Sequence, residues 1–341
     1  MRKKTYTIKD LAKMLGMSKS TVSRALRNQY DVSPSTREKV LELARKLDFE
    51  TNTLAASLRG NRSYIIGVII PSFSIPFYSI ALGGIQKMAV ANGYNVMVCQ
   101  TGEDFDNEVN TINYLLKSRV DGILISLSKN TDSVEHLLKV KNRGVPVVMF
   151  NRVVEDFNIP RVLIDDYTGA LNATRHLIEK HCRNIAHISG PASLLLSKRR
   201  MKGFTDALLE SNLTFNNELV VESDFTLESG KEAMKKLLSM DQQPDAVFCV
   251  CDAVAFGAMS VIKEKGLNVP EDISVAGFTN EPMAALVSPS LTTVAQPIED
   301  IGGKSVEILL EYINNFHSPH NTHHLVLTTE LIIRDSTLKN R

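Results

Sequence analysis

From residue 63 onward, short apolar runs alternate with amphipathic stretches, and this alternation strongly limits the possible folds. Buried, continuous apolar strands joined by helices favour parallel β-sheets that are covered by helices on both faces. Two such sets follow one another, and residues 151–160 interrupt them, so we expect an α/β body of two similar lobes. The expected strands cover residues 65–70, 96–99, 122–125, 145–149, 162–164, 185–188, 246–250 and 273–276, and the clearest helical patterns cover 80–91, 109–116, 168–178 and 256–265.

The charge is unevenly distributed along the chain. Residues 1–62 hold 14 Lys+Arg and 6 Asp+Glu, a net +8. The whole chain of 341 residues holds 39 and 38, which leaves 25 and 32, a net −7, for the remainder. The 43% of hydrophobic and 23% of charged residues are typical of a globular protein. A small basic head on an acidic body indicates a polyanion as the partner of the head.

The basic head begins with a clear helix signal. Thr7 and Asp10 are spaced as a capping box ahead of a helix over residues 8–15, and Gly16 suits the left-handed residue that ends it. A later helix is expected after Ser33, which can cap it ahead of a proline. The inner face of that helix would carry Val40, Leu43, Ala44 and Leu47.

Between these two helices, residues 19–26 form an expected helix with two different faces, capped by Ser18. At about 100° per residue, one arc is apolar and the other is rich in hydrogen-bond donors. A donor-rich helix that follows a tight glycine turn is typical of a helix-turn-helix, whose Arg, Lys and hydroxyl groups can bond bases and phosphates. A helical hairpin with a solvated charged face is the alternative. The apolar arc holds Val22, Ala25 and Leu26, and the opposite arc holds Lys19, Ser20, Ser23, Arg24 and Arg27.

Three stretches of the head carry a specific pattern: Ile8-Lys9-Asp10-Leu11-Ala12, Gly16-Met17-Ser18-Lys19-Ser20-Thr21-Val22-Ser23-Arg24-Ala25-Leu26, and Val32-Ser33 with Thr36-Arg37-Glu38-Lys39-Val40. This pattern resembles the headpiece of the LacI/GalR family of transcription regulators. The resemblance implies an all-α helix-turn-helix headpiece over residues 1–50 and a homodimer that binds palindromic double-stranded operator DNA. It also implies base contacts from Lys19, Ser20 and Arg24, and phosphate contacts from Ser18, Thr21 and Ser23.

Residues 51–62 resemble the hinge helix of the same family. A helix ending at Gly60 is too short to be stable alone, since isolated helices below ~12–15 residues are marginal in water. By resemblance it pairs with its copy from a second subunit in the minor groove, where a leucine wedges into a base step and bends the duplex. A plain linker is the alternative. The groove-contacting residues that the resemblance implies are Asn52, Ala55, Leu58 and Arg59.

The body, residues 63–341, resembles the two-lobed type I periplasmic-binding-protein fold of this family. Residues 290–296, Ser-Leu-Thr-Thr-Val-Ala-Gln, match the family signature at a crossing between the lobes. The fold implies three crossings, which we place near residues 162, 292 and 322. The first lobe would then hold residues 63–162 and 293–322, and the second lobe residues 163–292 and 323–341.

Polar and aromatic residues follow several expected strands, and α/β sheets bind ligands at the carboxyl ends of their strands. By resemblance these positions line an effector cleft. Their chemistry suits a sugar, because aromatic faces cover C–H patches while Arg, Asp and Asn chelate hydroxyl groups. Asp252 could instead cap the helix that follows it. The expected effector-binding residues are Phe77, Tyr78, Asn151, Arg152, Arg200, Asp252, Thr279 and Asn280.

One position departs from the family pattern. Many sugar-responsive members have Asp after the Gly-Phe or Gly-Tyr pair, whereas Thr279 follows Gly277-Phe278 in this chain. A neutral hydroxyl cannot chelate two sugar hydroxyls as a carboxylate does. Asn280 could substitute, or the effector could belong to another class, such as a nucleobase.

Enzyme motifs are poorly matched. Gly303-Lys304-Ser305 fits the end of a phosphate-binding loop, but Ile298 stands where the first glycine belongs, and no dinucleotide loop or nucleophile elbow is present. Cys249 and Cys251 lack further ligands at zinc spacing. We therefore predict no enzyme activity, no cofactor and no metal; a solute-binding or sugar-active protein on the same fold is the alternative. A solvated turn is the favoured interpretation of His317, His320, His323 and His324.

Targeting signals are also not matched. The chain turns polar directly after residue 4, whereas a signal peptide needs about 7–15 apolar residues there. The apolar run 65–70 is far shorter than the ~20 residues that cross a bilayer. We expect a cytoplasmic regulator, a repressor by the resemblance, that has no membrane partner and whose operator affinity a small molecule controls.

Overall fold

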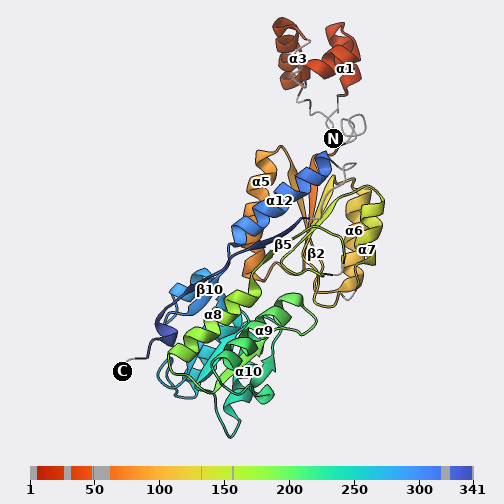
Figure 1. The fold of residues 1–341 in the computed structure, drawn as a ribbon. Coiled ribbons are helices and arrows are strands. Elements are labelled where there is room, and N and C mark those ends of the chain that lie inside the picture. The colour runs from red at the N-terminus through yellow and green to blue at the C-terminus, as the bar shows by residue number, and fades with distance from the viewer. Residues whose placement is uncertain are drawn as a thin grey trace. The chain divides into compact units, whose positions relative to one another are not determined.

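The computed structural model describes residues 6–26, 32–47, 49, 62–131, 133–155, 157–315 and 323–339. The chain divides into two compact units, Met1–Ser63 and Tyr64–Arg341 (Figure 1).

The first unit contains three helices in its described part, and each lies where the sequence predicts it. The Thr7 amide donates to Asp10 Oδ2 at 2.8 Å and the Asp10 amide donates to Thr7 Oγ1 at 3.4 Å, which confirms the capping box. Gly16 adopts φ 61°, the left-handed conformation that ends the first helix. The helices are α1 (Ile8–Leu15), α2 (Lys19–Leu26) and α3 (Pro34–Lys46), and their buried core holds Leu11, Ala12, Val22, Ala25, Val32, Val40 and Ala44.

Within its described residues, the second unit contains two six-stranded sheets, which confirms the predicted α/β class. The first sheet has the order β11-β5-β4-β3-β1-β2, with every pairing parallel. The second has the order β12-β10-β9-β8-β6-β7, parallel except that β12 runs antiparallel to β10. The strands of the first sheet are β1 (Ile65–Ile70), β2 (Asn95–Gln100), β3 (Gly122–Ile125), β4 (Val147–Phe150), β5 (Arg161–Ile164) and β11 (His324–Leu327). Those of the second are β6 (Ile185–Ser189), β7 (Val220–Glu222), β8 (Ala246–Cys249), β9 (Ser274–Thr279), β10 (Thr292–Ala295) and β12 (Glu330–Ile332).

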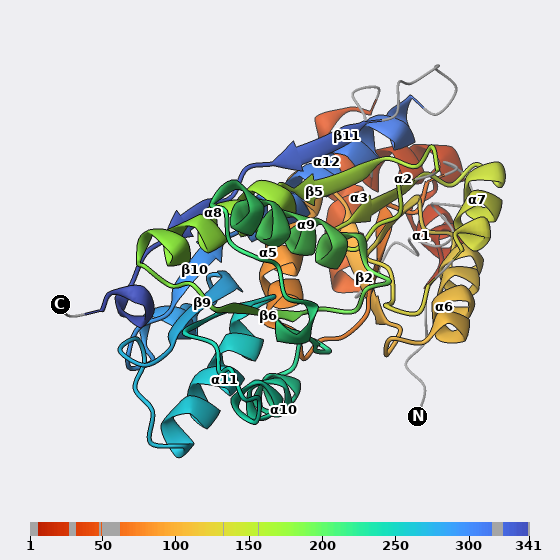
Figure 2. The same cartoon turned by 60° about the horizontal axis from the view of Figure 1, so that its bottom comes forward.

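Helices connect the strands and pack against both sheets (Figures 1 and 2). The first sheet is covered by α5 (Pro76–Ala91), α6 (Phe105–Lys117), α7 (Glu135–Asn142) and α12 (Ile298–Asn314). The second is covered by α8 (Asp166–Glu179), α9 (Leu195–Glu210), α10 (Leu227–Leu238) and α11 (Asp252–Glu264), and the short 3-10 helix η2 (Pro282–Ala285) follows β9.

Helices α5 and α12 lie side by side, and two glycines make this close approach possible (Figure 1). A Cβ atom on Gly84 would lie 2.0 Å from the carbonyl oxygen of Glu299, and one on Gly302 would lie 2.1 Å from that of Ala81. A side chain at either position would therefore collide with the backbone of the neighbouring helix.

The eight strands expected from the sequence are present, six of them with shifted ends, whereas β7, β10, β11 and β12 are strands that the sequence does not predict. Three of these, β7, β11 and β12, lie at sheet edges and are partly exposed, so they lack the continuous apolar run of a central strand. The fourth, β10, is buried but begins with two threonines.

The three predicted crossings between lobes are placed too early in the sequence. Strands β5 and β11 pair within the first sheet, and β10 pairs within the second, before the chain leaves each sheet. The crossings thus follow residues 164, 295 and 327, not residues 162, 292 and 322. The expectation failed because each strand completes its ladder of hydrogen bonds before the chain crosses, and the apolar pattern alone does not show which sheet a strand joins.

Candidate functional site

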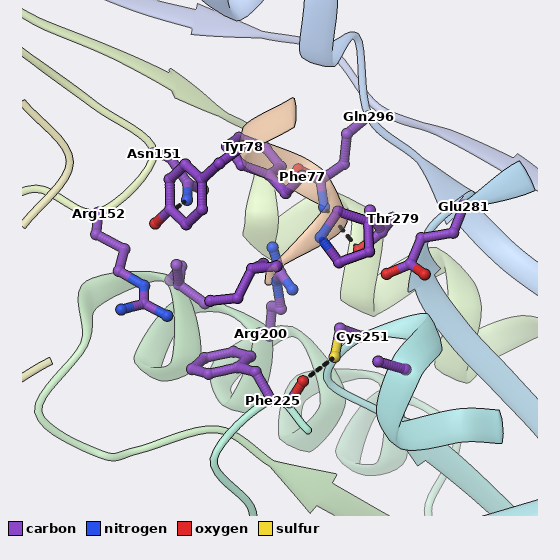
Figure 3. A pocket seen from close by; sticks show the side chains of 14 residues that line it. Phe77, Tyr78, Asn151, Arg152, Arg200, Phe225, Cys251, Thr279, Glu281 and Gln296 are labelled. Carbon is purple, nitrogen blue, oxygen red and sulfur yellow. Dashed lines mark hydrogen bonds between the residues drawn. The ribbon is translucent and has the colours of Figure 1, made fainter. Parts of the chain in front are cut away.

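One pocket of the second unit lies between the two lobes at the carboxyl ends of their strands (Figure 3). The first lobe contributes the start of α5 and the turn after β4. The second lobe contributes α9 and the segments after β7, β8 and β9, and Gln296 follows β10. The lining residues are Ile75, Pro76, Phe77, Tyr78, Asn151, Arg152, Leu196, Arg200, Phe225, Cys251, Ala253, Thr279, Glu281 and Gln296. Six of the eight predicted effector residues are among them: Phe77, Tyr78, Asn151, Arg152, Arg200 and Thr279.

Tyr78 anchors the wall that the first lobe provides. Its ring is buried, and its hydroxyl lies 2.9 Å from Ser126 Oγ and accepts from Asn151 Nδ2 at 3.3 Å. Burial raises the pKa of the Tyr78 hydroxyl. Asn151 adopts φ 60°, a left-handed conformation that asparagine tolerates better than most residues and that turns the chain directly after β4. The neighbouring Phe77 ring packs edge-on against Tyr78, with 5.3 Å between centroids.

Arg152 is held by groups from both lobes. Its Nη1 donates to both carboxylate oxygens of Glu103, at 2.7 and 2.9 Å, and its guanidinium carbon lies 5.1 Å from the centroid of the Phe225 ring. Only 4% of Arg152 is exposed, so this ion pair is screened little by solvent.

Arg200 is the corresponding buried cation of the second lobe. Its Nε donates to Asp166 Oδ1 at 2.8 Å, and its Nη1 donates to the carbonyl oxygen of Val250. These bonds orient the guanidinium at the pocket wall, where it can still donate to a ligand.

Two predicted effector residues do not line the pocket. Asp252 is fully buried and accepts from Thr293 Oγ1 and, at 2.7 Å, from the amide of Glu281, and burial raises the pKa of its carboxyl to about 6. Asn280 is turned aside, with its Oδ1 accepting from Arg334 Nη2 at 2.8 Å. Internal hydrogen bonds occupy both side chains and fix the turn after β9, so neither lines the pocket in this arrangement; their contact with a ligand stays a prediction.

Several lining residues were missed by the sequence reasoning, among them Phe225, Cys251, Glu281 and Gln296. Each follows a strand of the second sheet, so the rule that ligands bind at strand ends could have pointed to these four residues. The backbone at the end of β9 is strained, since its last residue, Thr279, has φ 142° and the next residue, Asn280, has φ 59°. A β-branched residue with positive φ is rare, and such strain gathers at binding sites.

The predicted DNA-contacting residues lie on or next to α2 of the first unit. Lys19, Ser20 and Arg24 are exposed, whereas Thr21 and Ser23 are half-buried. Ser18 caps the helix by accepting from the Thr21 amide at 3.1 Å, and its Oγ lies 2.6 Å from Ser20 Oγ. The predicted hinge residues Asn52, Ala55, Leu58 and Arg59 lie outside the described residues, as do His317 and His320.

Among the described residues, no three His, Cys, Asp or Glu side chains gather in a way that could hold a metal ion. The described helices also include none with the length and apolar character needed to cross a membrane.

Comparison with known families bears on both units. Residues 7–52 match the family model of bacterial regulatory proteins of the lacI family, and residues 63–334 match that of the periplasmic binding proteins and the sugar binding domain of the LacI family. The chain belongs to the LacI family. Among its LacI-family relatives, the catabolite control protein A of Priestia megaterium is 36% identical over 90% of this chain and 92% of its own length. The transcriptional repressor PurR of Actinobacillus pleuropneumoniae serotype 3 (strain JL03) is 34% identical over 97% of this chain and 98% of its own length.

Solved structures of LacI-family proteins are similar over the whole length. The Lac repressor dimer bound to operator and the anti-inducer ONPF has a TM-score of 0.88 and 27% identity, covering 98% of this chain and 100% of that one. A complex of the transcriptional regulator CelR with cellobiose has a TM-score of 0.75 and 30% identity, covering 97% of this chain and 99% of that one.

Proposed function

We propose that the pocket between the lobes binds a small hydroxyl-bearing molecule, and that its occupancy sets how tightly this DNA-binding regulator of the LacI family holds operator DNA. The observation that carries the proposal is the convergence of buried Arg152 and Arg200 with aromatic and amide side chains at one set of strand ends. Polar groups aimed into a mostly apolar pocket are typical of a ligand site.

The ligand class we propose is a sugar or sugar derivative. Phe77 and Phe225 supply flat apolar surfaces, and Asn151, Gln296 and the arginines supply groups that match hydroxyls. The similarity to a cellobiose-bound regulator supports a sugar. The similarity to a repressor named PurR keeps a nucleobase as the second candidate.

Control of DNA binding would arise from movement of the lobes. The space between the lining side chains is ≈ 50 Å³, far below the ~300–1,000 Å³ of a typical small-molecule pocket, so a sugar needs the lobes to separate. Contacts between the lobes near the pocket that this movement would break include Arg199 with Glu155 at 2.6 Å, Ser193 Oγ with the Lys129 carbonyl oxygen at 3.1 Å, and Arg152 with the Phe225 ring. A ligand that favours one lobe arrangement shifts the population toward it.

On the DNA side, we propose that the protein acts as a homodimeric repressor on a palindrome. Lys19, Ser20 and Arg24 would read bases in the major groove, and Ser18, Thr21 and Ser23 would hold phosphates. Asn52, Ala55, Leu58 and Arg59 would enter the minor groove. We further propose a cytoplasmic protein without enzymatic activity; turnover of a sugar by the chain lacking residues 1–60 would favour the alternative of a sugar-active protein.

The test is fluorescence anisotropy of a labelled duplex from the promoter beside the protein's own gene. We expect salt-sensitive binding that changes on addition of one member of a panel of mono- and disaccharides, with nucleobases as the second arm. A protein that binds no double-stranded fragment in a salt-dependent way, or whose DNA affinity responds to neither arm, would contradict the proposal.

A further inference from the structure

Glu281 lines the same pocket as Arg152 and Arg200, and the charges of both arginines are already neutralised. Glu103 pairs with Arg152 at 2.7 Å, and Asp166 pairs with Arg200 at 2.8 Å. Within the described ranges, the Glu281 side chain takes part in no ion pair and accepts no hydrogen bond, although only 9% of the residue is exposed. The carboxylate thus lines the pocket without a donor from the protein, and a ligand can supply that donor.

The fold holds Glu281 in place through its backbone. Its amide donates to Asp252 Oδ2 at 2.7 Å, and Pro282 starts η2 directly after it. The strained turn at Thr279 and Asn280 directs Asn280 toward Arg334, whereas Glu281 joins the pocket wall beside Thr279 and Cys251 (Figure 3). The carboxylate that is missing at position 279 is thus present in the pocket, two residues later.

We propose that Glu281 determines the ligand class of the pocket, which accepts a hydroxyl-rich molecule without negative charge that points hydrogen-bond donors at this carboxylate. The inference rests on the proposed function of the pocket as the effector site. Hydroxyl and ammonium groups can satisfy an ionised carboxylate, whereas a phosphate or acid group would meet like charge at low dielectric. Neutral sugars and amino sugars fit this requirement; sugar phosphates and sugar acids do not.

Ligand binding is then coupled to the ionisation of Glu281. Burial and the neighbouring Asp252 carboxylate raise the pKa of Glu281 to about 7. The other charged or titratable groups around it are Arg200 on α9, Cys251 at the start of α11, and Arg334, which faces Asp252 from beyond β12. A ligand that requires the ionised form binds more tightly as the pH rises through this value and displaces a proton near pH 7.

The test is isothermal titration of the full chain with matched sets of a neutral sugar, its 2-amino form and its 6-phosphate, from glucose, galactose and mannose, together with cellobiose and maltose. We expect a neutral or amino sugar to bind at pH 8, and the phosphate of its set to bind at least ~10-fold more weakly, because one like-charge contact of about 1.4 kcal/mol gives a tenfold change. From pH 8 to pH 6 its affinity should fall about 10-fold, since the ionised fraction of a group with a pKa of about 7 falls from roughly 0.9 to 0.1. Titrations in two buffers of different ionisation enthalpy at pH 7 should show release of a proton.

The matched variants are Glu281→Gln, which keeps the shape and removes the charge, and Glu271→Gln, which changes an exposed glutamate away from the pocket. We expect Glu281→Gln to weaken binding of that sugar about 10-fold at pH 8, to abolish the pH dependence and to reduce the discrimination against the 6-phosphate. Glu271→Gln should bind like the wild type. The proton release of the wild type tests the proposal without any variant.

Three results would overturn the proposal: tighter binding of a 6-phosphate than of its parent sugar, unchanged binding and pH dependence in Glu281→Gln, or binding of none of the neutral and amino sugars. Operator anisotropy with the same sugars separates this proposal from the proposed function. A sugar that obeys the Glu281 pattern but leaves DNA affinity unchanged contradicts only the regulatory role. A sugar that changes DNA affinity with no dependence on Glu281 contradicts only the inference about ligand class.

Discussion

The guanidinium carbon of Arg200 lies 3.7 Å from the centroid of the Phe278 ring, so a buried cation is stacked on the strand that leads into the pocket. The same guanidinium pairs with Asp166 on α8. One side chain thereby joins α8, α9 and β9 at the wall of the pocket.

Removing this cation should therefore lower the free energy of unfolding. Arg200→Ala leaves Asp166 buried without a partner, and we expect a loss of about 3–5 kcal/mol in the free energy of unfolding. Arg200→Lys keeps the charge but loses the planar fork and the stacking, and should lose less. Urea unfolding measures both. In Arg175→Ala, which removes an exposed ion pair with Glu210, the loss should stay below ~1 kcal/mol; a similar loss in all three variants would contradict this account.

Glu281 should make the stability of the ligand-free protein depend on pH. Its pKa rises from 4.5 to about 7 in the folded state, so the folded state binds the proton more tightly than the unfolded state. The contribution of this group is greatest below pH 4.5 and is lost as the pH rises toward 7. Urea unfolding at pH 5 and pH 8 measures this effect. The free energy of unfolding of Glu281→Gln, relative to that of the wild type, should rise by about 1–3 kcal/mol from pH 5 to pH 8. An equal difference at both pH values would show that the pKa is not raised.

Arg24 should contribute to base preference. Arg24 is exposed on α2, and a bidentate contact to guanine typically contributes about 1–3 kcal/mol of discrimination. We expect Arg24→Ala to weaken operator binding by that amount and to relax preference at one base position, measured by anisotropy on single-substitution duplexes. A uniform loss across all duplexes would instead assign Arg24 to a phosphate.

Leu58 should act through the shape of the DNA. If its side chain wedges into a base step, Leu58→Ala reduces the bend of the operator, because the unstacked step closes again. Circular-permutation gel shifts report this bend directly. Unchanged bending in the variant would rule out the wedge.

Replacing either of two adjacent glycines of α5 by alanine should change the stability of the protein in opposite directions. A Cβ on Gly84 would lie 2.0 Å from the Glu299 carbonyl oxygen, whereas one on Gly83 meets nothing within 4 Å. Gly84→Ala forces α5 and α12 apart and should cost about 1–3 kcal/mol or more. Gly83→Ala should stabilise the protein by about 0.4–1 kcal/mol, since alanine restricts the unfolded chain and favours helix. Thermal unfolding of the two variants, compared with the wild type, checks the contrast.

Much of the architecture follows from local patterns that the sequence shows directly. The capping box of Thr7 and Asp10 begins α1, and runs such as 65–70 become buried parallel strands, because helix caps and apolar periodicity act over a few residues. Edge strands such as β11 are not predicted from these patterns, because a partly exposed strand lacks a continuous apolar run.

Local sequence patterns predict the pocket only in part. Polar and aromatic residues after apolar runs, together with the family resemblance, indicated a cleft at the strand ends with Arg152 and Arg200 among its residues. Which of them line the pocket depends on the packing of distant segments: Asp252 and Asn280 support a strained turn, and Glu281 joins the pocket wall. The physical reason is that a side chain's direction depends on φ, ψ and hydrogen-bond partners contributed by distant segments, such as Thr293 and Arg334, and no local pattern encodes those partners.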